Sequence, residues 1–404
     1  MSQDIIIPVG SLNSLAEFSW RAGAALERFR TQPNEPPAAI QWDLRSVLPN
    51  RINTLAVVAL ESQIAAAASN FSVQQTVELP VNYGVAEYLE DIGFLDLLRR
   101  SGVDYGSWSR GHESRSQTIS TFPAFDKTFE LGPLLSAIDV DSQEIARIKE
   151  VYVEALARSL SAQFNTLHDI LVRRLARFKD SSWNGPYGHR IDKVFCDFFN
   201  DATRFLLAQF LAEAAVNSVL HAGDNTAKNP APFVGFQVSP RAATFAVVDS
   251  GKGLRRGILE RKAANRLFAC KGNDASAALS ALFWRSFFPD PEGFKIGLFQ
   301  CYKWFFEQLG RTPKLLPELH LFSGTAEYVI SREIHLPLLA LATSIGPEEL
   351  WSLGEQQLLS RLSAADFQPE DGPLSATRTP ILQRRRNPFL GTAIAFTVFW
   401  DRAT

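Results

Sequence analysis

Residues 246–253 read Ala-Val-Val-Asp-Ser-Gly-Lys-Gly, an apolar strand that runs into an aspartate and two glycines. An aspartate at the end of a strand can accept a hydrogen bond from an exocyclic amine, and glycines let the backbone turn with φ > 0 or approach a flat ring. Ordinary turns use the same residues. The stretch is not a dinucleotide fingerprint, because the third glycine, Gly257, comes one position late and no βαβ pattern follows. A P-loop is excluded, since Gly-x-x-x-x-Gly-Lys-Ser/Thr occurs nowhere in the chain.

A stripe of polar residues precedes this strand, in a segment with helical periodicity. Glu213, Asn217 and His221 are four residues apart, so on a helix they drift by only about 40° per step and share one face. Their neighbours are apolar, and polar groups on a buried helix are costly unless they meet a ligand. Two interpretations stay open: a ligand-binding face, or an exposed polar stripe in which His221 caps the helix before Gly223.

Two further glycine motifs follow along the chain. The segment Gly293-Phe294-Lys295-Ile296-Gly297-Leu298 opens an apolar helix, where unpaired N–H groups and the helix dipole favour phosphate. The alternative is an ordinary loop before a helix. The pair Gly391-Thr392 comes directly before the closing strand and could equally be a plain strand entry.

The composition narrows the class of protein. The chain has 404 residues, of which 46% are hydrophobic and 21% charged, enough for two or three domains with apolar cores. A net charge of -2 gives no basic excess, so no nucleic-acid partner is expected. Three scattered cysteines predict neither a disulfide framework nor a cysteine-based zinc site. The apolar run Leu336–Ile345 is about half of a bilayer span and the first residues do not read as a secretory signal, so a cytoplasmic protein without a membrane segment is expected.

Two folded regions joined by a linker are expected. Residues 1–100 alternate strand-like and helical segments, which favours a small α/β domain. Residues 101–140 are expected to be a linker, since periodicity is lost between Ser101 and Thr121. Residues 141–404 form the second domain, with an insertion at about 336–388. Its expected elements are helices at 141–178, 192–221, 275–287 and after Gly297, paired strands at 233–238 and 244–248, and strand-like segments at 320–322, 328–330 and 393–400.

The order and spacing of the four motifs resemble the GHKL (Bergerat-fold) ATPase domain. That family includes gyrase-type ATPase domains, histidine-kinase catalytic domains and anti-sigma-factor serine kinases. The resemblance covers residues 141–404 and implies an α/β two-layer sandwich of Bergerat type that binds ATP and Mg2+. A histidine kinase is disfavoured, because the sequence offers no convincing phosphoacceptor histidine on a dimerisation helix. His168 lies in the earlier long helix with only Asp169 beside it to prime it.

The resemblance assigns a role to each motif residue. Asn217 matches the asparagine whose amide oxygen holds Mg2+, a cation that prefers oxygen ligands. Glu213 matches the carboxylate that polarises the attacking water in hydrolysing members. Asp249 matches the residue that binds the adenine amino group, and Gly251 and Gly253 belong to the same motif.

The resemblance assigns the remaining motif residues to phosphate binding and to support of the adenine-binding aspartate. Gly297 and Leu298 match the second glycine motif, where backbone N–H groups meet phosphate. Thr392 matches the threonine that supports the adenine-binding aspartate. This glycine motif is poorer in glycine than the family's, so Lys295 either contacts a phosphate or marks a degraded motif. Residues 254–292 are expected to form the ATP lid, with candidate phosphate contacts at Arg255, Arg256, Lys262, Arg266 and Lys271.

The first hundred residues resemble STAS domains, the anti-sigma-factor-antagonist fold. The resemblance rests on the patterns at 43–47, 55–60, 77–80 and 88–94. The phosphorylatable serine of that fold is not evident, since Asn53 and Thr54 stand at about its place.

The sequence leaves three functions open. The first is a regulatory ATPase whose nucleotide state controls a protein partner or the STAS-like domain. The second is a serine/threonine kinase of the anti-sigma type, and the third is a scaffold that senses nucleotide without hydrolysis. The sequence does not separate ATPase from kinase, and a homodimer is an open alternative for its assembly.

Overall fold

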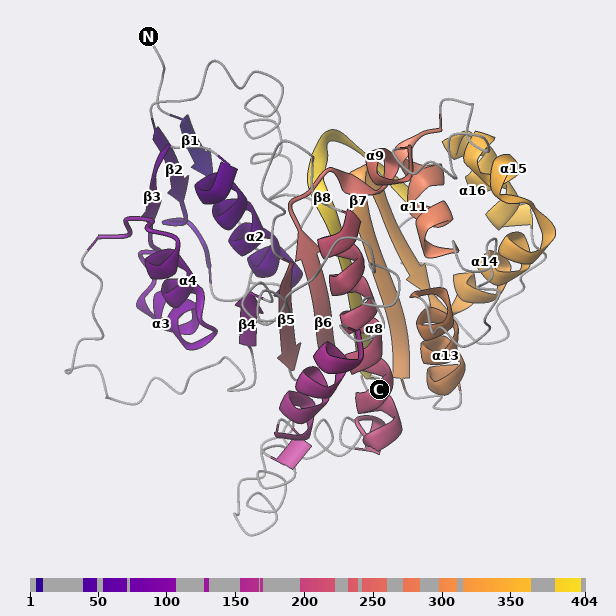
Figure 1. Ribbon diagram of the computed structural model, residues 1–404, viewed down its shortest axis with the longest axis horizontal. Coiled ribbons are helices and arrows are strands. Elements are labelled where there is room, and N and C mark those ends of the chain that lie inside the picture. Colours follow the sequence, from indigo (N-terminus) through magenta and orange to yellow (C-terminus); the bar gives the residue numbers. More distant parts are fainter. Residues whose placement is uncertain are drawn as a thin grey trace.

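The computed structural model describes residues 5–9, 39–48, 54–70, 73–106, 127–130, 153–166, 168–169, 197–221, 232–238, 242–259, 272–283, 298–310, 315–364 and 382–400. These residues form helices packed on two sheets, which confirms a mixed α/β class (Figure 1). No helix in this part of the chain is long and apolar enough to cross a membrane.

The N-terminal unit is a parallel sheet with helices. Its three strands pair in the order β1-β2-β3, and all are parallel, which requires crossover connections such as helix α2 between β2 and β3. Trp42 of β2 is fully buried, and its indole N–H donates to Gln75 of β3 at 2.9 Å. The elements are β1 (Ile5–Pro8), β2 (Ala39–Asp43), α2 (Thr54–Asn70), β3 (Gln74–Glu78), α3 (Tyr83–Asp91) and α4 (Phe94–Arg100).

The second unit is built on a five-stranded antiparallel sheet in the order β4-β5-β6-β8-β7. The strands are β4 (Lys127–Glu130), β5 (Phe233–Val238), β6 (Ala242–Asp249), β7 (Leu315–Ser331) and β8 (Leu382–Trp400). The predicted pairing of 233–238 with 244–248 is confirmed. The expectation of a linker at 101–140 is wrong at 127–130, because these residues form the edge strand β4 and pair with β5.

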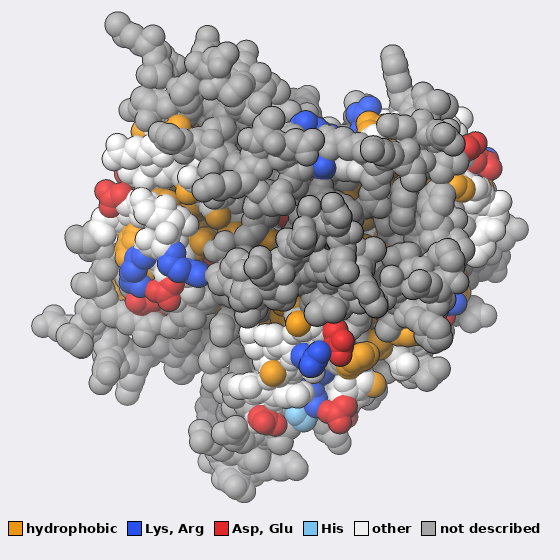
Figure 2. Space-filling model, viewed as in Figure 1, with side chains coloured by type: hydrophobic (Ala, Val, Ile, Leu, Met, Phe, Trp, Pro, Cys, Tyr) orange, Lys and Arg blue, Asp and Glu red, His pale blue; other side chains and the backbone are white. Residues whose placement is uncertain are grey.

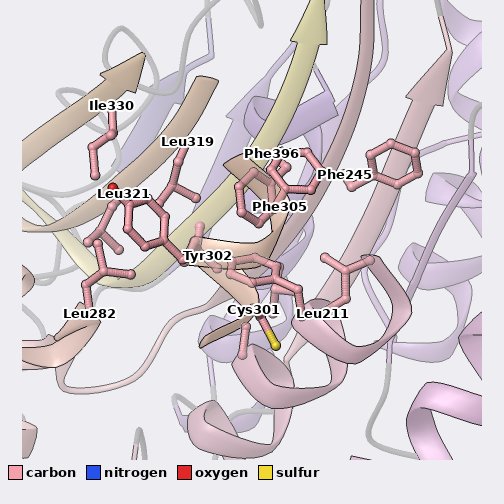
Figure 3. Packing of buried hydrophobic residues seen from close by; sticks show 14 of the residues in the cluster. Leu211, Phe245, Leu282, Cys301, Tyr302, Phe305, Leu319, Leu321, Ile330 and Phe396 are labelled. Atoms are coloured by element: carbon pink, nitrogen blue, oxygen red, sulfur yellow. The ribbon is translucent and has the colours of Figure 1, made fainter. Parts of the chain in front are cut away.

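One face of this sheet is covered by α8 (Asp201–His221) and α13 (Leu298–Gly310). Because side chains alternate along a strand, Phe245 and Val247 of β6 point into this layer. Tyr302 and Phe305 of α13 fill the space between the helices and the strands, and Phe305 lies 3.9 Å, centroid to centroid, from Phe396 of β8 (Figure 3).

The other face of the sheet packs against α2. Ala246 and Val248, which alternate with the residues above, share one buried cluster with Trp42 and Val57 of the N-terminal unit. Helix α2 therefore lies between the two sheets (Figure 1): it packs on β5 and β6, and the Gln75 amide of β3 donates to its Ile64 carbonyl at 3.3 Å. This explains why its sequence is apolar nearly all round, as expected of a helix without a solvent-facing side.

Helix α8 begins later than its sequence periodicity predicts. The expected continuous helix at 192–221 is wrong at Phe199 and Asn200, where the chain bends. The side chain of Asn200 accepts a hydrogen bond from the Thr203 backbone N–H at 3.1 Å, so Asn200 caps the new helix.

Strands β7 and β8 form a long hairpin that carries the insertion. The two short strands expected at 320–322 and 328–330 are a single strand, and a bulge interrupts its pairing with β8 between Ser323 and Ala326. The insertion is shorter than the expected 336–388, because β8 already begins at Leu382. Its described helices are α14 (Arg332–Ser344), α15 (Pro347–Ser352) and α16 (Glu355–Ala364).

Candidate functional site

Asp249 ends strand β6 with a buried carboxylate that is 2% exposed. Its Oδ1 accepts the backbone N–H of Gly251 at 2.9 Å, and its Oδ2 lies 2.8 Å from the hydroxyl of Ser218. Thr392 stands directly opposite on β8, and its backbone N–H also donates to the carboxylate. The structure thus joins the strand-end aspartate, the first glycine motif and the Gly391-Thr392 pair in one place.

Ser218 is a site residue that the sequence analysis missed. It follows Asn217 on α8 and so lies about 100° from the polar stripe, which is why a search at four-residue spacing passed over it. Its hydroxyl has a single hydrogen but two acceptors within reach, Asp249 Oδ2 at 2.8 Å and the Ala214 carbonyl at 3.0 Å. Both contacts are satisfied together when a protonated Asp249 donates to Ser218 and Ser218 donates to Ala214.

Burial raises the pKa of Asp249 to about 6, although the hydrogen bonds from Gly251, Ser218 and Thr392 act in the opposite direction. At a pH near 6 the protonated and the ionised forms of Asp249 are therefore both populated. A buried acid that costs free energy in this way is characteristic of functional sites.

The turn after Asp249 is held by close backbone contacts. Gly253 has φ 76° and Gly391 has φ 106°, both in the region that favours glycine. The hydroxyl of Ser323 accepts the Leu254 backbone N–H at 2.8 Å and donates to the Gly391 carbonyl at 3.3 Å. Ser323 therefore ties the start of helix α9 (Gly253–Leu259) to strand β8.

The predicted stripe on α8 extends away from Asp249. Asn217 is half-buried, next to Ser218. Glu213, one turn earlier, is buried, and its charge acts on the thiol of Cys301 in the first turn of α13. Burial first, and the Glu213 charge second, raise the pKa of Cys301. Helix α8 therefore contacts the end of β6 through Ser218 and the start of α13 through Glu213, and the side chain of His221 lies outside the described part.

The second glycine motif is described only at its end. Lys295 and Gly297 lie outside the described residues. Leu298 is the first residue of α13, which confirms the predicted start of a helix after Gly297. Its side chain is half-buried and packs against the main hydrophobic core, so it serves the packing of the helix.

The expected lid contains two described helices, α9 and α11 (Asp274–Leu282). Arg255 and Arg256 are exposed on α9, and an Arg255 guanidinium nitrogen lies 4.0 Å from Asp274. The other candidate cations, Lys262, Arg266 and Lys271, fall outside the described residues.

The insertion packs on the start of α11. A Cβ on Gly272 would lie 2.1 Å from the ring of Trp351, which is 1% exposed. Trp351 belongs to α15 and shares a small apolar cluster with Ile258 of α9 and Ala277 of α11. The Asn273 amide donates to the Leu353 carbonyl at 3.0 Å, so α9 and α11 are both attached to the insertion.

Charge is mixed on the face of the molecule shown in Figure 2. Acidic and basic side chains lie next to each other over α3 and α4, where Arg99 contacts Asp96. Within the described ranges no three His, Cys, Asp or Glu side chains gather as a metal site. A divalent cation here would take Asn217 as a protein ligand and draw its other oxygen ligands from a bound phosphate or water.

Comparison of the chain with protein-family models, with curated proteins and with solved structures gave no match. The function is therefore inferred from the geometry of the site.

Proposed function

We propose that the chain binds ATP with Mg2+ at the end of strand β6, in a domain of the Bergerat type. The observation that carries the proposal is the buried Asp249 carboxylate, framed by a glycine turn, by Thr392 and by Ser218 of α8. Burying a carboxylate costs free energy, and recognition of a ligand amine gives a reason to keep it.

Asp249 would read the adenine base. A carboxylate has about four lone-pair positions, and the N–H of Gly251, the Ser218 hydroxyl and the N–H of Thr392 use three of them. The fourth can accept a hydrogen bond from the adenine amino group. The ionised form accepts most strongly, so adenine binding would favour loss of the Asp249 proton.

Helix α8 would carry the phosphate chemistry. The amide oxygen of Asn217 would hold Mg2+, which supplies charge neutralisation for phosphoryl transfer when it is bound. Glu213, buried one turn away, would orient and deprotonate the attacking water or hydroxyl. Gly297 and Lys295 would contact phosphate from the loop before α13.

The N-terminal unit is proposed as a STAS-like regulatory domain of a cytoplasmic protein with a further protein partner. The N-terminal unit packs through α2 on the sheet whose strand β6 ends at Asp249, and this packing supports a regulatory role. A slow ATPase is the preferred activity, and a serine/threonine kinase is the alternative, since a protein hydroxyl could take the place of the water beside Glu213.

Incubation with γ-labelled ATP and Mg2+ tests the activity. Release of free phosphate supports the ATPase, and label retained on protein supports the serine/threonine kinase. ATP binding without either product supports the nucleotide-sensing scaffold. Absence of ATP binding at millimolar concentration would refute the proposal itself.

A further inference from the structure

Helix α2 carries three consecutive polar residues in the middle of an apolar sequence. Glu61, Ser62 and Gln63 are 1%, 1% and 2% exposed. Polar side chains at a buried interface cost free energy unless they are well bonded, and apolar residues would satisfy packing alone. The triplet therefore points to a task beyond holding the two units together.

Two of these residues contact the segments that present Asp249. The Ser62 hydroxyl lies 2.7 Å from the Ser250 hydroxyl, and the Gln63 amide donates to the Leu390 carbonyl at 3.0 Å. The other amide atom of Gln63, Oε1, has no hydrogen-bond partner within the described part of the chain.

Each contact point is next to a residue that packs on or bonds Asp249: Gly251 bonds its carboxylate, and Gly391 lies against its backbone carbonyl. Ser250 lies between Asp249 and Gly251, whose N–H donates to Asp249 Oδ1 at 2.9 Å. Leu390 precedes Gly391, where a Cβ would lie 1.9 Å from the Asp249 carbonyl oxygen. A shift of α2 relative to the sheet therefore moves the two segments between which the carboxylate is held.

We propose that Ser62 and Gln63 are positioning residues for adenine recognition, through which the N-terminal unit sets the affinity of the site for adenine nucleotides. The inference rests on the proposed function and adds the route of its regulation. Coupling of this kind is reciprocal, so a nucleotide bound at Asp249 must also strengthen the contacts of α2.

A double-mutant cycle on the full chain tests the route. ATP·Mg2+ and GTP·Mg2+ are titrated calorimetrically into the wild type, S62A, S250A and the double variant. We expect S62A to weaken ATP binding by about fivefold or more, a typical size for coupling between sites, and to lower the ATP-to-GTP affinity ratio. In the S250A background the effect of S62A should disappear, because its partner is already lost.

Gln41→Met is the matched control. Gln41 is an amide of β2 that donates to Glu78 of β3 at 2.7 Å, a bond that does not involve α2. The variant removes a hydrogen bond from the same unit and should leave the affinity ratio unchanged, which separates positioning from general destabilisation.

Hydrogen exchange of the wild type covers the case in which S62A does not fold. Amides of α2 around Ser62 should become more protected when ATP·Mg2+ is added, whereas amides of α4 should not change. Unchanged exchange in α2, or unchanged ATP affinity and selectivity in S62A and Gln63→Ala, would overturn the inference while leaving ATP binding in place. A wild type that does not bind ATP would overturn the proposed function and this inference with it.

Discussion

Gly391 lies so close to Asp249 that a Cβ on the glycine would be 1.9 Å from the aspartate's carbonyl oxygen. Gly391 also has φ 106°, a backbone angle that residues with a side chain rarely adopt. We expect Gly391→Ala to lower the free energy of unfolding by about 3 kcal/mol or more, from strain and overpacking combined. Thermal denaturation measures this. Gly346→Ala is the control, since nothing lies within 4 Å of the position that its Cβ would take, and it should change stability by less than about 0.5 kcal/mol.

Asp249→Asn should fold and lose adenine affinity. The new amide can donate to Ser218, which then donates to Ala214, while its oxygen still accepts from Gly251. A neutral amide loses the charge-assisted part of the bond to adenine, about 1.5–3 kcal/mol or roughly ten- to hundred-fold in affinity. Calorimetric titration checks this, and equal ATP affinity in both proteins would remove Asp249 from the base site.

The same variant should change how stability depends on pH. The folded pKa of Asp249, about 6, lies above its ordinary value of 3.8, so the folded state holds the proton more tightly. This contribution to stability is full below pH 3.8 and is lost as the pH rises through 6. Between about pH 4 and pH 7 the unfolding free energy of the variant should therefore gain about 2 kcal/mol on that of the wild type. Parallel denaturant titrations at the two pH values measure the difference, and a constant gap would contradict the assigned pKa.

Asn217→Ala should remove the Mg2+ dependence of ATP binding and leave the fold intact. The side chain is half-buried, so its loss creates little cavity. Binding is compared with and without Mg2+, and Gln209→Ala, another half-buried amide on α8, is the control. A variant that unfolds would show that Asn217 is a structural residue.

Glu213→Gln should separate chemistry from binding. Glutamine keeps the volume of the buried side chain and cannot take a proton, so ATP affinity should stay within a few-fold. Turnover should fall by about 10²–10⁴, the usual contribution of a positioned base. Single-turnover phosphate release measures the rate on the same preparations. A rate equal to that of the wild type would mean that Glu213 is not the base.

Gly272→Ala should disturb the attachment of the insertion. Its Cβ would collide with Trp351 at 2.1 Å, and overpacking typically costs about 1–3 kcal/mol. Trp351→Leu removes the colliding ring, so the double variant should be less destabilised than the sum of the two single variants. Additive losses in thermal unfolding would show that the two residues do not meet.

The sequence predicted those features that depend on local pattern. The β5–β6 pair and the start of α13 are confirmed, because alternation and glycine punctuation are local signals. Strand β4 was missed, since its four residues at a sheet edge carry too little pattern to stand out from their surroundings. Ser218 lies off the four-residue stripe, and both Ser218 and Ser323 act through partners that only the folded chain brings near.

The burial of α2 between two layers could be predicted from its own sequence. A helix that is apolar on all sides predicts burial between two layers, and the polar triplet at 61–63 interrupts it. What covers each side depends on tertiary packing, which periodicity does not contain. The predicted boundary near residue 100 is a boundary of sequence pattern, and the cluster of buried side chains continues across it.

That continuity limits how the molecule can move. Parting the N-terminal unit from the sheet would bring Phe233, Val248, Phe322 and Phe389 into water, at about 1.5–3 kcal/mol for each side chain. These costs oppose a swinging-domain mechanism, with two rigid bodies on a hinge. We expect signals between the two halves to pass through small displacements in a packed interior, and the two halves to melt in one cooperative transition.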